Sequence, residues 1–268
     1  MHRRGEISEA WLTRLTRSAT ALAAMILATA AAPTRATAAE PPSGAKGAQA
    51  EIQLGLCAPA EQIVHALDLR ARGTPITVWQ FDDAALTLFG RGVRMRLRVA
   101  ADGRSEFTLK VADQDCARLA PDAVPAGEGK CEYDVYGTGT AGAVSLTRHL
   151  DARSTGELVA GRLAPARVLS PAQTTYLREV VKIWPLPPGI RALGPMRVRT
   201  YRAADRPYDV DISQLPGGAQ YAEISRKVPA ADATRLKGIM EADLSRAGVE
   251  TCADQSSQAA SKLRSLLR

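Results

Sequence analysis

The sequence is poor in several residue types, and each shortage excludes a class of protein. Aromatic residues make up 4% of the 268 residues and hydrophobic residues 46%, so aliphatic side chains must fill the core. Beyond the first 39 residues no apolar run reaches the roughly 20 residues that a membrane-spanning helix needs. That part holds only two histidines, His65 and His149, and its four cysteines form no CxxC pair. A zinc site is therefore disfavoured.

The N-terminal segment has the pattern of an export signal. Four arginines precede an apolar run over 19–32, and small residues at 36–38 suit signal peptidase. We expect residues 1–39 to be a signal peptide and residues 40–50 a flexible leader. An uncleaved anchor is the alternative, although the run is short for a bilayer span. The expected product is periplasmic or secreted, with no stable membrane insertion after cleavage.

The charge that remains after cleavage is modest. Without residues 1–39 the chain has 30 basic and 26 acidic residues, a net charge of about +4. This excess is too small to indicate nucleic-acid binding, so we expect no nucleic-acid partner. The oligomeric state has no signature in the sequence.

The four cysteines favour disulfides over thiol chemistry. An even number in an exported chain is typical of a disulfide framework, and four cysteines allow three pairings. Cys116 and Cys131 flank a loop rich in proline, glycine and alanine, so we favour a local bridge between them. The second bridge, Cys57–Cys252, would then join the two ends of the domain.

The pattern along the chain predicts one α+β domain rich in antiparallel strands. Helices are expected after Pro59, over 142–181 in two pieces with Ser170-Pro171 opening the second, and over 229–247. The tail over 251–268 is expected to be a helix that docks on its own domain, with a membrane or a partner as alternatives. Strands are expected over 51–56, 76–81, 92–100, 105–111, 129–137, 195–202, 208–212 and 221–228.

Most of these strands alternate between apolar and charged residues. Arg94, Arg96 and Arg98 share one strand face, and the acidic residues of other strands have the same parity. An antiparallel sheet with one solvated face gives the same alternation. However, neighbouring arginines repel unless an anion lies between them, and carboxylate pairs suit a hard divalent cation. If the sheet closes into a barrel, the charged face lines the lumen.

Three segments in this order resemble the CYTH family, also called triphosphate tunnel metalloenzymes. The similarity covers about residues 51–245. Its motifs are WQFDDAALTLFGRGVRMRLRVAADGRSEFTLKV (79–111), GKCEYDVYG (129–137) and YDVDISQLPGG with YAEIS (208–225).

The resemblance implies a fold, a cofactor and site residues. The fold would be an antiparallel, eight-stranded closed barrel over 51–250 with helices outside, binding a small phosphate-containing anion in its tunnel. The cofactor would be Mg²⁺ or Mn²⁺, held by Glu51, Glu132, Asp134 and Glu223. Catalysis would involve Glu51, Glu132 and Glu223, which orient the attacking water. Phosphates would be held by Arg94, Arg96, Lys110, Lys130, Arg197 and Arg199.

The sequence departs from the family pattern in its acidic motifs. The opening Glu-x-Glu-x-Lys becomes Glu51, Gln53 and Gly55, and the closing Glu-x-Glu becomes Glu223 and Ser225. A neutral amide binds a divalent cation more weakly than a carboxylate does. Because nucleoside triphosphates are scarce outside the cytoplasm, polyphosphate or another organic phosphate is the expected ligand.

Three functions stay open at this point. The first is a metal-dependent phosphohydrolase for a triphosphate or polyphosphate. The second is a tunnel that binds an anion without turnover, and the third is a structural or partner-binding exported domain.

Overall fold

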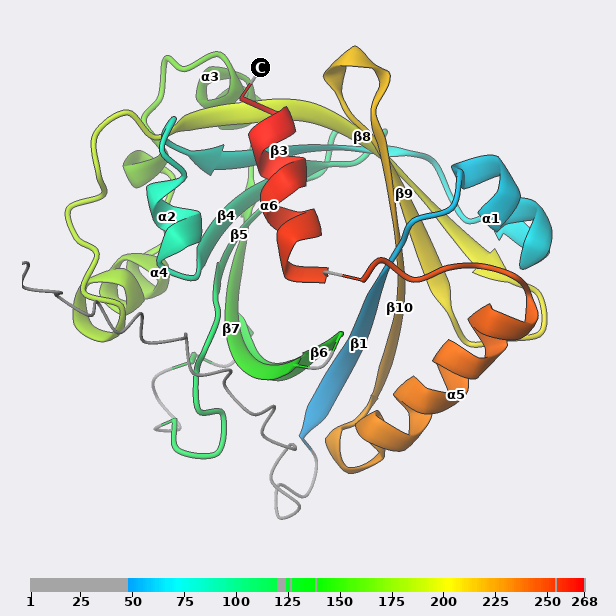
Figure 1. The fold of residues 1–268 in the computed structure, drawn as a ribbon. Coiled ribbons are helices and arrows are strands. Elements are labelled where there is room, and N and C mark those ends of the chain that lie inside the picture. Colours follow the sequence, from blue (N-terminus) through cyan, green and yellow to red (C-terminus); the bar gives the residue numbers. More distant parts are fainter. Residues whose placement is uncertain (1–47, 120–123, 126, 138, 254, 268) are drawn as a thin grey trace, which may run out of the picture. The chain divides into compact units, whose positions relative to one another are not determined.

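The computed structural model describes residues 48–119, 124–125, 127–137, 139–253 and 255–267 (Figure 1). The expected signal peptide lies outside these residues, as does most of the expected leader. The described chain forms one sheet that closes on itself, with helices packed against it.

Nine strands form the closed barrel. Their order around it is β8-β3-β4-β5-β7-β6-β1-β10-β9, and β9 pairs back with β8. All neighbouring pairs are antiparallel except β1 and β6, which are parallel. A further strand, β2 (Leu69–Ala71), pairs with β8 outside this ring. The barrel strands are β1 (Gln49–Leu56), β3 (Ile76–Asp82), β4 (Val93–Val99), β5 (Ser105–Val111), β6 (Gly129–Tyr136), β7 (Gly139–Leu150), β8 (Arg191–Ala203), β9 (Asp209–Gln214) and β10 (Gln220–Pro229).

The expected barrel of eight antiparallel strands is thus corrected to nine strands with one parallel pair. Strand β7 lies where the sequence predicted the start of a helix. Its buried Val144 and Leu146 alternate with Ser145 and Thr147, so its period is that of a strand. Local composition favoured a helix, but pairing with β5 and β6 decided the outcome.

Helices cover the outer face of the barrel. The apolar side chains of β1, β9 and β10 pack under α1 and α5, and those of β4, β5 and β7 pack under α3 and the segment that follows it. Burying an aliphatic side chain of this kind contributes about 1.5–3 kcal/mol. The α-helices are α1 (Ala60–Ala66), α2 (Thr87–Gly90), α3 (Ala152–Val159), α4 (Pro171–Thr175), α5 (Ala233–Arg246) and α6 (Gln255–Ser265). Three segments are 3₁₀ helices, η1 (Pro165–Arg167), η3 (Pro216–Gly218) and η4 (Ala230–Asp232), and η2 (Tyr176–Val180) is a π-helix.

The start of α4 agrees with the sequence. Ser170 caps the helix, Pro171 occupies its first turn, and Gln173 completes a capping box. The fully buried Gln173 amide also donates to the carbonyls of Phe107 and Leu146, at 3.3 and 2.9 Å. These two bonds fasten α4 to β5 and β7.

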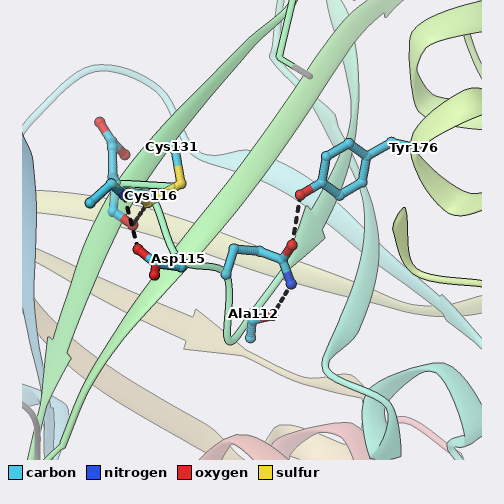
Figure 2. The surroundings of a disulfide bond; sticks show 8 residues. Ala112, Asp115, Cys116, Cys131 and Tyr176 are labelled. Carbon is cyan, nitrogen blue, oxygen red and sulfur yellow. Dashed lines mark hydrogen bonds between the residues drawn. A yellow bond between two sulfur atoms is a disulfide. The ribbon is translucent and has the colours of Figure 1, made fainter. Parts of the chain in front are cut away.

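Two disulfides, one long-range and one local, form in the pairing favoured from the sequence. Cys57 at the end of β1 is bonded to Cys252, and Cys116 is bonded to Cys131 on β6. Figure 2 shows the second bridge, with Tyr176 beside the same loop. Disulfides are typical of proteins that mature in oxidising compartments, which is consistent with export.

The C-terminal helix α6 packs on its own domain, as expected. It lies across the opening of the barrel that faces the viewer in Figure 1. Leu263 and Leu266 pack against Val78, Met196 and Val198 of β3 and β8. No helix among the described residues is long and apolar enough to span a bilayer.

Candidate functional site

The barrel encloses a cavity of about 370 Å³ lined by charged side chains. A wider, more open hollow of about 730 Å³ lies beside the Cys57–Cys252 bridge, but Glu61 is its only charged lining residue among those described. We place the candidate site in the barrel because strand alternation gathers charges of both signs there. The described lining includes five basic residues, Arg94, Arg96, Arg98, Lys110 and Lys262, and four acidic residues, Glu51, Asp134, Asp211 and Glu223.

Strand β4 supplies the three arginines of the basic wall. Alternation directs Arg94, Arg96 and Arg98 into the cavity, while Met95 and Leu97 are buried in the outer core. Within the described residues, none of the three has a carboxylate partner within 4.0 Å. The Arg94 guanidinium lies over the Phe89 ring at 5.6 Å. This wall therefore presents cationic donors that no acid of the described chain neutralises directly.

Arg96 is the most constrained of these residues. Its Nε is buried and has no hydrogen-bond acceptor in the part of the chain that the structure describes. Burial, aided by the charges of Arg98 and Arg94 and opposed by those of Glu223 and Glu51, lowers the Arg96 pKa to about 9, so the group stays cationic at neutral pH. A buried, charged donor without an acceptor is costly, and a bound anion would satisfy it.

The acidic wall is built in two levels separated by a neutral row. Glu51 of β1 lies beside Asp134 of β6, and Glu223 of β10 lies beside Asp211 of β9. Between these levels, Gln53 of β1 pairs with Ser225 of β10. Gln53 and Ser225, two of the three positions where the sequence departs from the expected acidic and basic pattern, thus form the gap between the carboxylate pairs.

At each level, carboxylates of the acidic wall already accept a hydrogen bond from, or form an ion pair with, other side chains of the protein. Lys110 Nζ lies 2.5 Å from an Asp134 carboxylate oxygen, and the Gln53 amide donates to Glu51 at 2.8 Å. At the other level, the Thr200 hydroxyl donates to Asp211 at 2.6 Å.

Glu223 has a raised pKa. The residue keeps accessible surface and lines the cavity, where the surrounding barrel wall reduces the hydration of the carboxyl. This loss of hydration is the main reason why the pKa is raised. Lys262 and Arg94 act in the opposite direction, whereas Asp211 and Glu51 raise the pKa further.

The acids present do not fit the expected Mg²⁺ or Mn²⁺ site. Among the described residues no three side chains of Asp, Glu, His or Cys converge as metal ligands. Asp134 already pairs with Lys110, and the neutral row divides the remaining carboxylates. At the Glu51–Asp134 level a divalent cation would have to displace Lys110 from Asp134, and the Glu223–Asp211 level offers only two carboxylates of the described chain.

The structure brings together six of the residues expected at the site: Glu51, Asp134, Glu223, Arg94, Arg96 and Lys110. Glu132 and Lys130 are not among the cavity lining. Glu132 instead pairs with Lys130 at 2.5 Å and with Lys227 at 3.7 Å. By alternation along β6 both residues share the inner face with Asp134, and Lys227 pairs in register with Glu51, so this cluster of ion pairs lies next to the Glu51 end of the cavity.

Arg197 and Arg199 lie away from the cavity, contrary to expectation. Both are exposed, whereas Met196 and Val198 line the cavity and pack against α6. Because side chains alternate along a strand, the two arginines point to the outer surface. We leave them out of the proposed site.

Sequence reasoning omitted three charged residues of the lining. Arg98 had the signal of Arg94 and Arg96, since it continues their alternation. Asp211 had only the parity that it shares with the acidic residues of the other strands, and its neighbour Glu223 had the stronger motif. Lys262 had no signal, because the pattern of the tail does not tell which surface the helix covers.

Comparisons with known proteins identify proteins of similar structure. No protein-family profile and no curated protein matches the chain. A proposed adenylyl cyclase from Hippeastrum with a dominant triphosphatase activity matches 78% of this chain and 92% of its own, at 19% identity and a TM-score of 0.52. A proposed adenylate cyclase from Bacillus halodurans matches 78% and 95%, at 12% identity and a TM-score of 0.52. The chain therefore shares its fold, a closed barrel with helices, with proteins described as adenylate cyclases.

Proposed function

We propose that this chain binds a triphosphate- or polyphosphate-type anion inside its barrel. The observation that carries the proposal is the basic wall of β4: among the described residues, its three arginines have no carboxylate partner and the buried Arg96 Nε has no acceptor. Guanidinium groups bind phosphate oxygens through paired, charge-assisted hydrogen bonds. Arginines spaced along one strand suit an anion with several phosphate groups in a row.

The volume of the cavity and the expected location of the protein are consistent with a small ligand. Its volume of about 370 Å³ lies within the range of about 300–1,000 Å³ that is usual for small-molecule sites. If the chain is exported, as the N-terminal pattern and the two disulfides suggest, the ligand is an inorganic polyphosphate or an organic phosphate of that compartment.

Ligand-induced stabilisation tests this proposal. Thermal unfolding of the purified, disulfide-bonded protein is measured with tripolyphosphate, pyrophosphate and phosphate. A ligand at a hundredfold excess over Kd stabilises the folded state by about 2.7 kcal/mol, and we expect the largest effect with tripolyphosphate. The double variant Arg94→Gln/Arg96→Gln should lose most of this stabilisation.

A matched control uses arginines on the outer helices. Arg153→Gln/Arg235→Gln removes the same charge from α3 and α5, where both residues form exposed ion pairs, and should respond like the unmodified protein. The proposal fails if none of the three anions stabilises the protein, or if the Arg94/Arg96 variant responds as strongly as the control.

Hydrolysis of the anion is a second candidate function. A structural relative with triphosphatase activity favours it, whereas the paired acids of the lumen give it no support. Phosphate release from tripolyphosphate with Mn²⁺ decides between binding and turnover. We expect no release above that of the Arg94/Arg96 variant, and release that is abolished by Glu223→Gln would instead establish a hydrolase.

A further inference from the structure

Two lysines extend into the acidic wall from opposite sides of the barrel. Lys110 belongs to β5 and Lys262 to α6, so they are far apart in sequence, but both line the same cavity. Each is close to a different level of carboxylates.

Lys110 reaches Asp134 across an intervening strand. The strand order is β5-β7-β6, so the contact between Lys110 and Asp134 passes over β7. The β7 residues in register beneath it are Ser145 beside Lys110 and Ala141 beside Asp134. Such small side chains leave room for the lysine stem, and the ammonium group sits 2.5 Å from the carboxylate.

Lys262 is placed at the other level by the packing of α6. Leu263 and Leu266 anchor the helix against β3 and β8, and Lys262 Nζ donates to the Ser213 hydroxyl at 2.8 Å. Burial lowers the Lys262 pKa, and the charges of Glu223 and Asp211 oppose this shift. The ammonium group therefore acts on both carboxylates of that level.

Resting on the proposed function, we infer that the tunnel binds its phosphate-type anion without a divalent metal ion, because Lys110 and Lys262 supply positive charge on the acidic wall. Each lysine is a monovalent cation fixed to the chain beside carboxylates that would otherwise repel the ligand. The neutral Gln53–Ser225 row separates these carboxylates and prevents them from converging on a metal. The anion then lies between the arginines of β4 and the two lysines.

The test compares anion binding with and without metal. Isothermal titration of the purified protein with tripolyphosphate is carried out in EDTA, and again with Mg²⁺ or Mn²⁺. We expect the affinity in EDTA to equal or exceed that with metal, since free metal competes for the anion. Tighter binding with either metal overturns the inference while the proposed function survives. Absence of binding under both conditions overturns the proposed function and the inference with it.

Lysine variants test whether the charges of Lys110 and Lys262 contribute to the affinity for the anion. In EDTA, Lys110→Gln/Lys262→Gln should bind tripolyphosphate at least about tenfold more weakly, a change of about 1.4 kcal/mol. Lys110→Arg/Lys262→Arg keeps both charges and should retain most of the affinity. The control Lys237→Gln removes a lysine that pairs with Glu241 on α5, and should bind normally. Melting curves without ligand confirm that each variant is folded, and a folded Gln double variant with unchanged affinity overturns the inference.

Discussion

The Arg96 guanidinium is enclosed by the barrel together with two other arginines. Its Nε has no acceptor among the described residues, and the charges of Arg98 and Arg94 disfavour its cationic form, which Glu223 and Glu51 offset in part. Such an environment costs stability in the free protein and is relieved by an anion. The residue is therefore suited to binding at the expense of folding, as is common at functional sites.

Arg96→Gln should stabilise the protein in the absence of ligand. We expect the free energy of unfolding to rise by on the order of 1 kcal/mol, because a buried charge with an unsatisfied donor is removed. Urea unfolding in a buffer free of phosphate measures this change. The exposed control Arg235→Gln should shift stability by less than about 0.5 kcal/mol. A destabilised Arg96→Gln would show that the guanidinium is well satisfied in the free protein.

Glu223 should make stability depend on pH. Its folded pKa is raised above the ordinary value of 4.5, so the folded state binds the proton more tightly than the unfolded state does. This contribution is fully present below pH 4.5 and is lost as the pH rises through the folded pKa. Relative to Glu223→Gln, the protein without ligand should therefore become progressively less stable across this window.

Melting temperatures of both proteins from pH 4 to pH 8 measure the effect of Glu223. Glu61→Gln, outside the barrel lumen, serves as a control for the loss of a carboxylate. A constant difference between Glu223→Gln and the unmodified protein over this range would contradict the raised pKa.

The arginines show how far the sequence could predict the site. The repeated spacing of Arg94 and Arg96 is local, so it identified the basic wall. The same reasoning placed Arg197 and Arg199 inside, but parity tells which residues share a face and not which face is enclosed. On β8 the apolar residues point inward because α6 covers them there.

Among the elements, α6 has the largest effect on the site. The sequence predicted a tail helix that docks on the domain, but its docking surface depends on contacts more than 60 residues away along the chain, such as that of Leu263 with Met196. Strand β7 was missed for a related reason, since pairing with β5 and β6 fixed its conformation. Elements defined by local alternation, such as β4 and β5, were predicted closely.

Leu263→Ala should loosen α6. The side chain is buried against β3 and β8, and truncation of a buried leucine costs about 2–5 kcal/mol. A smaller loss, near the lower limit, is expected at the end of a chain because the helix can detach locally. Faster trypsin cleavage within α6 and a lower melting temperature would show this. Arg264→Ala, on the exposed side of the helix, should leave the melting temperature unchanged, and equal effects of the two variants would contradict the packing of α6.

At the scale of the whole molecule, the disulfides close loops of very different length. Cys57 and Cys252 are 195 residues apart, whereas Cys116 and Cys131 are 15 apart. In the chain-entropy model a longer loop gives greater stabilisation, about 3 kcal/mol for a 15-residue loop and about 5 kcal/mol for one near 200 residues. The long bridge also joins β1 to the segment that leads to α6.

Replacing each cysteine pair by serine should therefore affect stability unequally. We expect Cys57→Ser/Cys252→Ser to lower the free energy of unfolding more than Cys116→Ser/Cys131→Ser does. Denaturant titration without reductant compares the two variants. A greater loss from the short bridge would show that local strain or packing, and not loop closure, determines the contribution of these bonds.

The closed barrel brings the charged faces of separate strands into one cavity, so the proposed function depends on an anion that enters the lumen. The most direct measurement is the electron density of crystals soaked with tripolyphosphate in the presence of EDTA. The account predicts a chain of phosphates inside the barrel, within hydrogen-bonding distance of Arg94 and Arg96 and of the Lys110 and Lys262 ammonium groups. An empty lumen, or an anion bound only at Arg197 and Arg199 on the outer surface, would contradict it.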